Sequence, residues 1–251
     1  MTIRESIRAQ WESIKDKSAK EKLAYFWHYY GFRTVLILCI VSLAIFFAVE
    51  VITQKEYAYT GIFFGSQEQE SADRYMAEFA GRVGIDTEEY ELTVQSLLDI
   101  RLDGQVTEEL YQTIATFTAL VETNMVDNIA AETDLFLYYS YLGYTADLRT
   151  QLAYEQLEAL APHLIYMDAA LIAEQQNTGE APTIDYKNFP DPKDPDAMTD
   201  PVPVGIDLTA ASEAFHNAYQ FSAEGPVIGI CSTTEKPETS VNFLRYIFDL
   251  E

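Results

Sequence analysis

One long apolar stretch interrupts a chain in which polar and apolar residues otherwise alternate in short periods. No charged residue lies between Thr34 and Val49, and Leu, Ile, Val, Phe and Ala make up most of that stretch. A helix needs about 20 mostly apolar residues, within a range of roughly 17 to 25, to cross a bilayer core. The stretch reaches this length with the aromatic residues before it, since aromatic side chains favour the membrane–water interface. The pattern therefore predicts a transmembrane helix at residues 26–52, in contact with the lipid bilayer.

The charges on the two sides of this stretch predict its orientation. Residues 1–33 hold seven Lys or Arg and four acids, whereas residues 50–251 hold nine Lys or Arg and 36 acids. Lys and Arg close to a span favour the cytoplasmic side, so we expect a cytoplasmic N-terminus and an extracellular C-terminal part. A cleaved signal peptide is the alternative, but small residues would mark its cleavage site and its basic lead would be short. An uncleaved signal anchor in the cell membrane is the preferred interpretation.

Residues 1–25 are predicted to form a juxtamembrane amphipathic helix. Ser18 and Glu21 have the spacing of a capping box, which would start the helix that leads into the membrane. The helix is expected to lie on the inner leaflet or to contact a cytoplasmic partner. Its apolar stripe follows from steps of four, four and three residues between Ile3, Ile7, Trp11 and Ile14.

After the span, apolar residues recur with alternating strand and helix periods. This order is typical of an α/β layer with right-handed crossovers and a partly parallel sheet. We therefore predict one compact extracellular α/β domain at residues 53–251. Strands are expected at residues 56–65, 90–100, 134–139, 204–208 and 226–232, and helices at 71–82, 107–131, 145–160, 209–219 and 238–250.

Residues 177–203 form a Pro/Asp-rich segment that breaks this alternation. Six of the nine prolines fall within it, which predicts a loop or an irregular hairpin. Its carboxylates could hold calcium outside the cell, because calcium prefers oxygen ligands. The spacing does not match an EF-hand loop, so a plain connecting loop is the preferred interpretation. The carboxylates concerned are Asp191, Asp194, Asp196 and Asp200.

The net charge of −24 limits the classes of partner. Phosphate backbones need a basic surface, so we expect no nucleic acid partner. A solvated acidic surface is the ordinary explanation of the charge, and attraction of cationic partners is the alternative. Of the two cysteines, Cys39 falls in the predicted span and Cys231 near the C-terminus, so the two cannot meet, and neither an internal disulfide nor a redox pair is expected. No cofactor is predicted.

Motifs that support catalysis are not found in the sequence. It has neither a Gly-x-Ser-x-Gly elbow nor a His-Glu-x-x-His pair, and no glycine-rich phosphate loop. Of three histidines, His28 falls in the aromatic flank of the span, while His163 and His216 stand among apolar residues and are expected to be structural. We therefore expect that the protein is not an enzyme.

The most specific local pattern is the segment YYSYLGY at residues 138–144, after the strand predicted at residues 134–139. In open α/β sheets, ligands bind outside the carboxyl ends of strands. Tyrosines there could stack on a sugar or peptide or bind a cation, and the alternative is that they pack the core. The end of the first predicted strand would face the same cleft. The candidate ligand-binding residues are Phe63, Phe64, Ser66, Tyr139, Ser140, Tyr141 and Tyr144.

Several segments together resemble a known family. They are NIAAETDLFL at residues 128–137, VGIDL at 204–208, VIGICS at 227–232 and VNFLRYI at 241–247. In this order, after an anchor, the pattern is similar to extracellular solute-binding proteins of the type 2 periplasmic-binding fold, in the membrane-tethered form of Gram-positive bacteria. The resemblance implies a reduced version of that fold, since residues 56–251 are few for two full lobes.

Two hypotheses for function follow. In the first, the protein is a membrane-tethered extracellular binding protein for a small solute or peptide, without catalysis. In the second, it is a structural or regulatory protein of the cell envelope whose extracellular domain binds another protein. A solute receptor requires a cleft with converging polar groups, whereas an interaction module requires an exposed docking surface.

Overall fold

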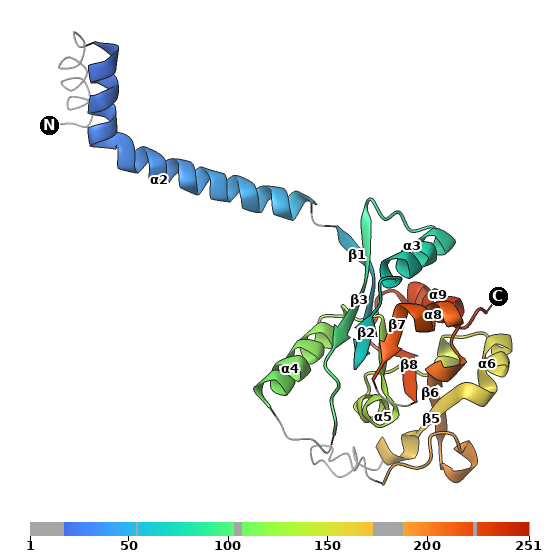
Figure 1. The fold of residues 1–251 in the computed structure, drawn as a ribbon. Helices are drawn as coiled ribbons and strands as arrows, with labels where there is room; N and C mark the ends of the chain where they lie inside the picture. Colours follow the sequence, from blue (N-terminus) through green and yellow to red (C-terminus); the bar gives the residue numbers. More distant parts are fainter. Residues whose placement is uncertain (1–17, 54, 103–106, 173–187, 223–224, 251) are drawn as a thin grey trace. The chain divides into compact units, whose positions relative to one another are not determined.

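The computed structural model describes residues 18–53, 55–102, 107–172, 188–222 and 225–250 (Figure 1). The chain divides into two compact units, residues 1–54 and residues 55–251. The described part of the first unit is one long helix, and the second unit contains the sheets. The helix predicted before residue 18 lies outside the described residues.

The helix of the first unit, α2 (Ala19–Thr53), begins where the capping box predicts. The Ser18 N–H donates to Glu21 Oε2 over 3.0 Å, and the Glu21 N–H donates to Ser18 Oγ over 3.4 Å. This exchange provides partners at a helix start, where backbone N–H groups otherwise have none. Within the described residues, no helix is both long enough and apolar enough to cross a membrane. The span predicted at residues 26–52 therefore stays a prediction.

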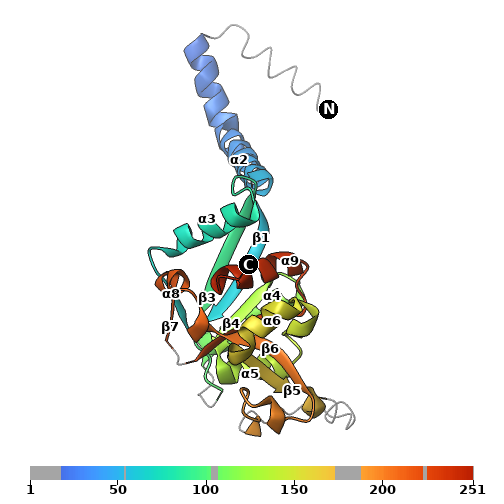
Figure 2. The ribbon, with the colours of Figure 1, turned by 90° about the vertical axis from the view of Figure 1, so that its right-hand side faces the viewer.

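The second unit is built on a six-stranded mixed sheet in the order β3-β1-β4-β8-β6-β5 (Figures 1 and 2). The first three strands in this order are parallel, and each of the other three is antiparallel to the strand before it. The prediction of an α/β fold with partly parallel pairing is confirmed. The strands are β1 (Glu56–Phe64), β3 (Tyr90–Leu97), β4 (Asn128–Glu132), β5 (Leu164–Asp168), β6 (Pro201–Asp207) and β8 (Pro226–Ile230). A small antiparallel sheet pairs β2 (Ser66–Glu68) with β7 (Tyr219–Phe221).

Helices cover both faces of the large sheet, because the central strands carry apolar side chains on both faces. In β1, Phe63 packs with one core cluster and Ile62 with the other. The first cluster lies under α3 (Ala72–Val83), α6 (Tyr154–Leu160), α8 (Glu213–Ala218) and α9 (Pro237–Ile247). The second lies under α4 (Glu108–Glu122) and α5 (Thr133–Tyr141). The result is a three-layer α/β/α arrangement, in which strands buried on both faces are expected to be apolar throughout.

The helix predicted at residues 107–131 is wrong in its second half. Thr107 caps α4 by accepting the Leu110 N–H over 3.2 Å, as its position suggests, but the helix ends at Glu122. Asn124 takes a left-handed conformation, with φ of 58°, and turns the chain into β4. Three of the five residues of β4 are Ala or Asn, which are poor strand formers, so local propensity hides a strand that tertiary burial imposes.

The strand predicted at residues 134–139 is also wrong, because these residues form α5. Leu135, Phe136, Leu137 and Tyr139 are all buried, so this helix has apolar residues on most of its sides. A short apolar run without polar alternation does not distinguish a buried strand from a buried helix. One helix is predicted at residues 145–160, but the structure has only α6 and a single 3-10 turn, Leu148–Thr150, in this range.

Candidate functional site

The two phenylalanines of the predicted cleft lie on opposite faces of the sheet. Phe63 and Phe64 are consecutive residues of β1 and are 0% and 1% exposed. Phe63 contacts Phe215 and Tyr219 in one core cluster, whereas Phe64 contacts Phe117 in the other. Since neighbouring strand residues point to opposite faces, the structure does not bring these two side chains together.

The tyrosines predicted to join them come from α5 and from the turn after it. Tyr139 stacks on Phe64 with 5.6 Å between ring centroids and on Tyr144 with 5.8 Å, and it contacts Phe117 at 4.6 Å. Burial raises the pKa of the Tyr139 hydroxyl above its usual value. Phe64, Tyr139 and Tyr144 are thus brought together, as one aromatic cluster between β1, α4 and α5. Only Tyr144 of these three is partly exposed.

The remaining predicted residues make internal hydrogen bonds. Ser66 Oγ lies 2.7 Å from Ser96 Oγ and ties β2 to β3. Ser140 Oγ donates to the Phe136 carbonyl one helical turn back. Tyr141 holds the Pro/Asp-rich segment: its ring stacks on Phe189 at 4.4 Å, and its hydroxyl accepts the Asp168 N–H over 3.0 Å. Six of the seven candidate residues are buried, which agrees with the packing alternative for the tyrosines.

A cavity of about 500 Å³ opens at the carboxyl ends of two of the parallel strands. Ile100–Leu102 come shortly after β3, which ends at Leu97. Glu132 is the last residue of β4, and Asp134, Leu135 and Leu137 belong to α5. The third wall comes from Phe189–Pro192 of the Pro/Asp-rich segment. This carboxyl-edge cavity has the size of small-molecule sites, which typically measure 300–1,000 Å³, and the location that open α/β sheets favour.

The walls of the carboxyl-edge cavity combine charged and apolar groups. Asp134 and Asp191 are exposed carboxylates at its rim, and Glu132 and Arg101 each engage other groups of the chain. Leu135, in contrast, is buried and gives the cavity an apolar wall. Such an arrangement can bind and orient a ligand that carries amine or amide donors next to an apolar part.

The Pro/Asp-rich wall is fixed by Asp168 at the end of β5. The Asp168 carboxylate accepts backbone N–H groups of Thr199, Asp200 and Ala170 over 2.9–3.1 Å. Burial alone would raise the pKa of Asp168, but these three donors hold it below its usual value. Within the described residues, no group of three or more His, Cys, Asp or Glu is placed to hold a metal ion. The calcium hypothesis therefore gains no support from the described aspartates.

A second buried carboxylate, Asp127, joins three elements at the amino end of β4. Its side chain accepts the Thr60 N–H over 2.8 Å and the Thr234 hydroxyl, and Lys236 Nζ lies 3.9 Å away. Asp127 is 1% exposed, and burial raises its pKa above the usual value. The contacts are all internal, so this group joins β1, β4 and the start of α9. Its partners lie 67 and more than 100 residues away in sequence, so no local pattern indicates it.

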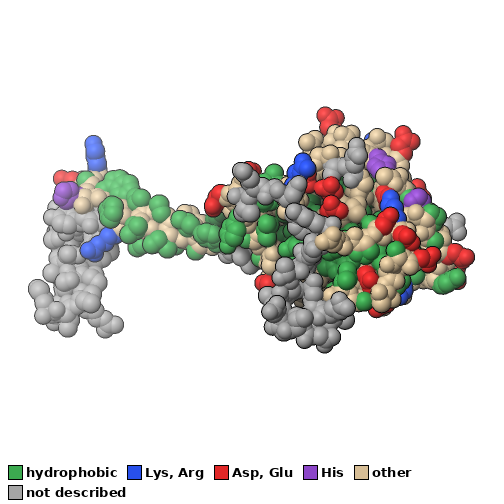
Figure 3. All heavy atoms as spheres, turned by 90° about the horizontal axis from the view of Figure 1, so that it is seen from below, with side chains coloured by type: hydrophobic (Ala, Val, Ile, Leu, Met, Phe, Trp, Pro, Cys, Tyr) green, Lys and Arg blue, Asp and Glu red, His purple; other side chains and the backbone are tan. Residues whose placement is uncertain are grey.

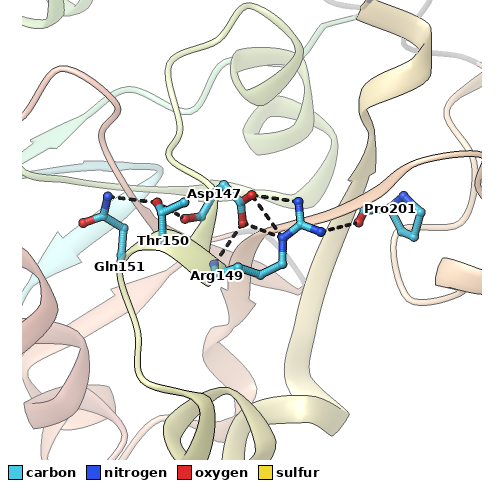
Figure 4. A network of polar contacts seen from close by, with 5 residues as sticks. All are labelled: Asp147, Arg149, Thr150, Gln151 and Pro201. Carbon is cyan, nitrogen blue, oxygen red and sulfur yellow. Dashed lines mark hydrogen bonds and ion pairs between the residues drawn. The ribbon is translucent and has the colours of Figure 1, made fainter.

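Another polar network lies beside the large sheet and is also structural (Figure 4). Asp147 accepts two hydrogen bonds from the Arg149 guanidinium at Oδ2, from Nε over 3.0 Å and from Nη2 over 2.7 Å. Asp147 also caps the 3-10 turn that follows it, and Arg149 Nη1 donates to the Pro201 carbonyl at the start of β6. The network therefore fastens this turn to the sheet.

No protein-family model matches the chain, and no match is found among curated proteins or among solved structures. The carboxyl-edge cavity itself is therefore the evidence from which function is argued.

Proposed function

We propose that the protein is a membrane-anchored binding module that displays its α/β domain outside the cell and takes a small solute or peptide without chemical conversion. The carboxyl-edge cavity is the observation that carries this proposal, because it joins a suitable volume, exposed carboxylates and apolar wall at the usual ligand position of open α/β sheets. The resemblance to extracellular solute-binding proteins agrees with the same function.

The anchor in this proposal rests mainly on the amino-acid sequence. The uncharged run from Thr34 to Val49 continues to Ile52 with only Glu50 as a charged residue, and some of these side chains lie outside the described residues. The described ones are exposed apolar groups on several sides of α2, for example Leu38 at 62% and Phe46 at 64%. Apolar surface on all sides of a helix requires lipid or a protein partner to cover it.

Carbonate extraction and protease protection test the anchor. Membranes from cells that make the full-length protein are washed at high pH, and intact cells are treated with a protease. We expect the protein to stay in the membrane pellet and the domain after Lys55 to be digested from outside, while a tag before Met1 survives. Release by the wash, or protection of the domain, would refute the proposed location.

Ligand binding is tested on full-length protein in a non-ionic detergent by calorimetric unfolding against amino acids, sugars and short peptides. A ligand at about 100 times its dissociation constant should stabilise the protein by roughly 2.7 kcal/mol. The Asp134→Asn variant removes one rim carboxylate and should weaken a cationic ligand. The matched control is Asp196→Asn, an equally exposed aspartate that does not line the cavity. Equal loss in both variants, or no stabilisation by any ligand, would refute the proposal.

Binding of another protein is the second candidate function, and exposed apolar side chains favour it. Tyr111 and Ile114 of α4 are 65% and 36% exposed, and Leu98, after β3, is 45% exposed. Scattered single apolar residues are ordinary, so these side chains alone do not define an interface. The groove described next gives this candidate a definite position.

A further inference from the structure

The strand β3 forms one edge of the large sheet. Its only strand neighbour in the described chain is β1, so backbone N–H and C=O groups on its other side have no strand partner there. An exposed edge of this kind can accept an extended segment as an additional strand. Glu91, exposed on this edge, disfavours pairing with a second, equally acidic copy of the same chain.

A groove of about 540 Å³ runs between this edge and helix α3. Leu92 and Val94 of β3 and Met76 of α3 line its apolar part, and all three belong to or pack against the same core cluster. A strand and a helix thus flank the groove in the arrangement that peptide-binding domains use for strand addition, with backbone pairing on one side and side-chain pockets on the other.

One end of the α3–β3 groove is acidic. Glu68 of β2 and Asp73 of α3 both line it, and neither forms an ion pair with a Lys, Arg or His of the described chain. Burial and the nearby charge of Asp73 raise the pKa of Glu68, which indicates two carboxylates without a compensating cation. Lys55 lines the groove too, but its Nζ donates to the Thr87 carbonyl over 2.6 Å.

Tyr219 provides the second observation at this end of the groove. Its side chain is 1% exposed and lines the groove. Burial, Glu68 and Asp73 all raise the pKa of this hydroxyl, which therefore stays protonated and lies close to both carboxylates. Tyr219 therefore adds a neutral hydroxyl to the two carboxylates at this end of the groove.

The chemistry of this end selects the ligand group. Two carboxylates and one hydroxyl accept hydrogen bonds, and an ammonium or guanidinium group donates three to five. The described residues provide no set of three His, Cys, Asp or Glu for a metal ion here. A basic side chain therefore suits the site better than a metal.

We propose that the groove between α3 and β3 is a docking site for an extended basic segment of another protein, which pairs with β3 as an added strand and places a Lys or Arg side chain against Glu68 and Asp73. The charge of the chain after residue 49 supports this choice of partner, because residues 50–251 hold 36 acids and nine Lys or Arg. Acidic side chains are spread over the face of the domain that Figure 3 shows. Opposite charge then speeds the encounter, and backbone pairing holds the segment in place. This site is separate from the carboxyl-edge cavity, so either can fail without the other.

The probe for the test is an acetylated and amidated peptide of alternating lysine and valine, with a fluorescent label, added to full-length protein in a non-ionic detergent. Fluorescence anisotropy measures its affinity at physiological ionic strength. The double variant Glu68→Gln with Asp73→Asn should weaken binding about tenfold, since it removes both charged acceptors. The matched control, Glu88→Gln with Glu89→Gln, changes the net charge equally on exposed residues outside the groove and should leave affinity within about twofold.

Two further measurements separate strand addition from general attraction of cations. The same peptide with methylated backbone nitrogens keeps its charge but cannot pair with β3, so it should not bind. Amide hydrogen exchange of residues 90–97 should slow when the unmethylated peptide is bound. The variant Tyr219→Phe, which keeps the ring in the core, should weaken binding about threefold.

Four results would overturn the proposal. They are equal weakening by the control pair, equal binding of the methylated peptide, unchanged exchange in β3, and no binding at all. Circular dichroism checks that each variant is folded. A peptide of alternating glutamate and valine is the negative control, and its binding with equal affinity would also contradict the expected charge preference.

Discussion

Substitution of Gly205 by alanine tests how α5 is held against the sheet. Gly205 of β6 and Gly229 of β8 both lie under the ring of Phe136, which is fully buried. A Cβ atom at Gly205 would lie 2.5 Å from Val227 Cγ1 and 2.6 Å from Phe136 Cε1. Contacts this short require the neighbouring side chains or the strand to shift.

The cost follows from the burial of both neighbours. Phe136 and Val227 are 0% exposed, so neither side chain has solvent to move into. An extra methyl group in a close-packed core typically costs 1–3 kcal/mol. We expect Gly205→Ala to lower the free energy of unfolding by about 2 kcal/mol, which is roughly 4–8 °C in the midpoint for a domain of this size.

Gly81 provides the control of opposite sign. It lies inside α3 with an ordinary helical backbone, and a Cβ atom there would meet nothing within 4 Å. Alanine is a better helix former than glycine by about 0.5–1 kcal/mol, so Gly81→Ala should stabilise the domain. The same chemical change is thus expected to destabilise at one site and stabilise at the other.

Urea unfolding of full-length protein in detergent measures both variants. Trp11 and Trp27 both precede the α/β domain, so tyrosine near-ultraviolet circular dichroism is the suitable probe of that domain. If Phe136 is responsible, Phe136→Leu combined with Gly205→Ala should cost less than the sum of the two single changes. A Gly205→Ala variant as stable as the parent, or a strictly additive pair, would refute this account of the packing.

Three further substitutions test the polar groups. Tyr141→Phe keeps the stack on Phe189 but leaves the Asp168 N–H without its acceptor. The variant should lower the free energy of unfolding in urea by about 1 kcal/mol and leave ligand binding unchanged. Loss of ligand binding would make Tyr141 a site residue. The pKa of Asp168 is lowered in the folded state, so the carboxylate contributes stability above its usual pKa, and this contribution is lost as the pH falls through the lowered pKa. Asp168→Asn should therefore destabilise the protein at neutral pH and reduce its acid sensitivity. An unchanged pH profile of the urea midpoint would contradict this expectation. The pKa of Asp127 is raised in the folded state, so its contribution to stability is present below its usual pKa and is lost as the pH rises through the raised pKa. Relative to Asp127→Asn, the parent protein should gain stability on acidification between these two pKa values. Parallel pH profiles of the urea midpoint in parent and variant would refute the raised pKa.

Local chemistry predicted the element boundaries that depend on one or two side chains. Ser18 and Glu21 form the predicted capping box, and Thr107 caps α4. Gly84 ends α3 with a left-handed φ of 74°, a conformation that glycine adopts without the steric cost of a Cβ atom. These features could be predicted since the interactions span only a few residues.

Elements defined by distant partners could not be predicted in the same way. β5 has no alternating pattern, and it is a strand because β6 pairs with it antiparallel. β2 and β7 have three residues each, and they pair across 150 residues of sequence. Asp127 likewise stabilises the fold only through hydrogen bonds to residues that are distant in sequence and that the sheet brings together. Sequence periodicity reports local burial, and it has no information on which distant segment supplies the neighbour.

The candidate site shows how one strand boundary changes the residues to which a general rule points. Ligands are expected at the carboxyl ends of strands, and the cavity does lie there. With a strand predicted at residues 134–139, the rule points to the tyrosines after it, yet β4 already ends at Glu132. The same rule applied to the observed strand points to Glu132 and Asp134, which line the cavity, and it places the tyrosines on the following helix, where they pack the core. The observed strand boundary therefore moves the candidate site from the buried aromatic cluster to the rim carboxylates, and it is on these carboxylates that the binding experiments should concentrate.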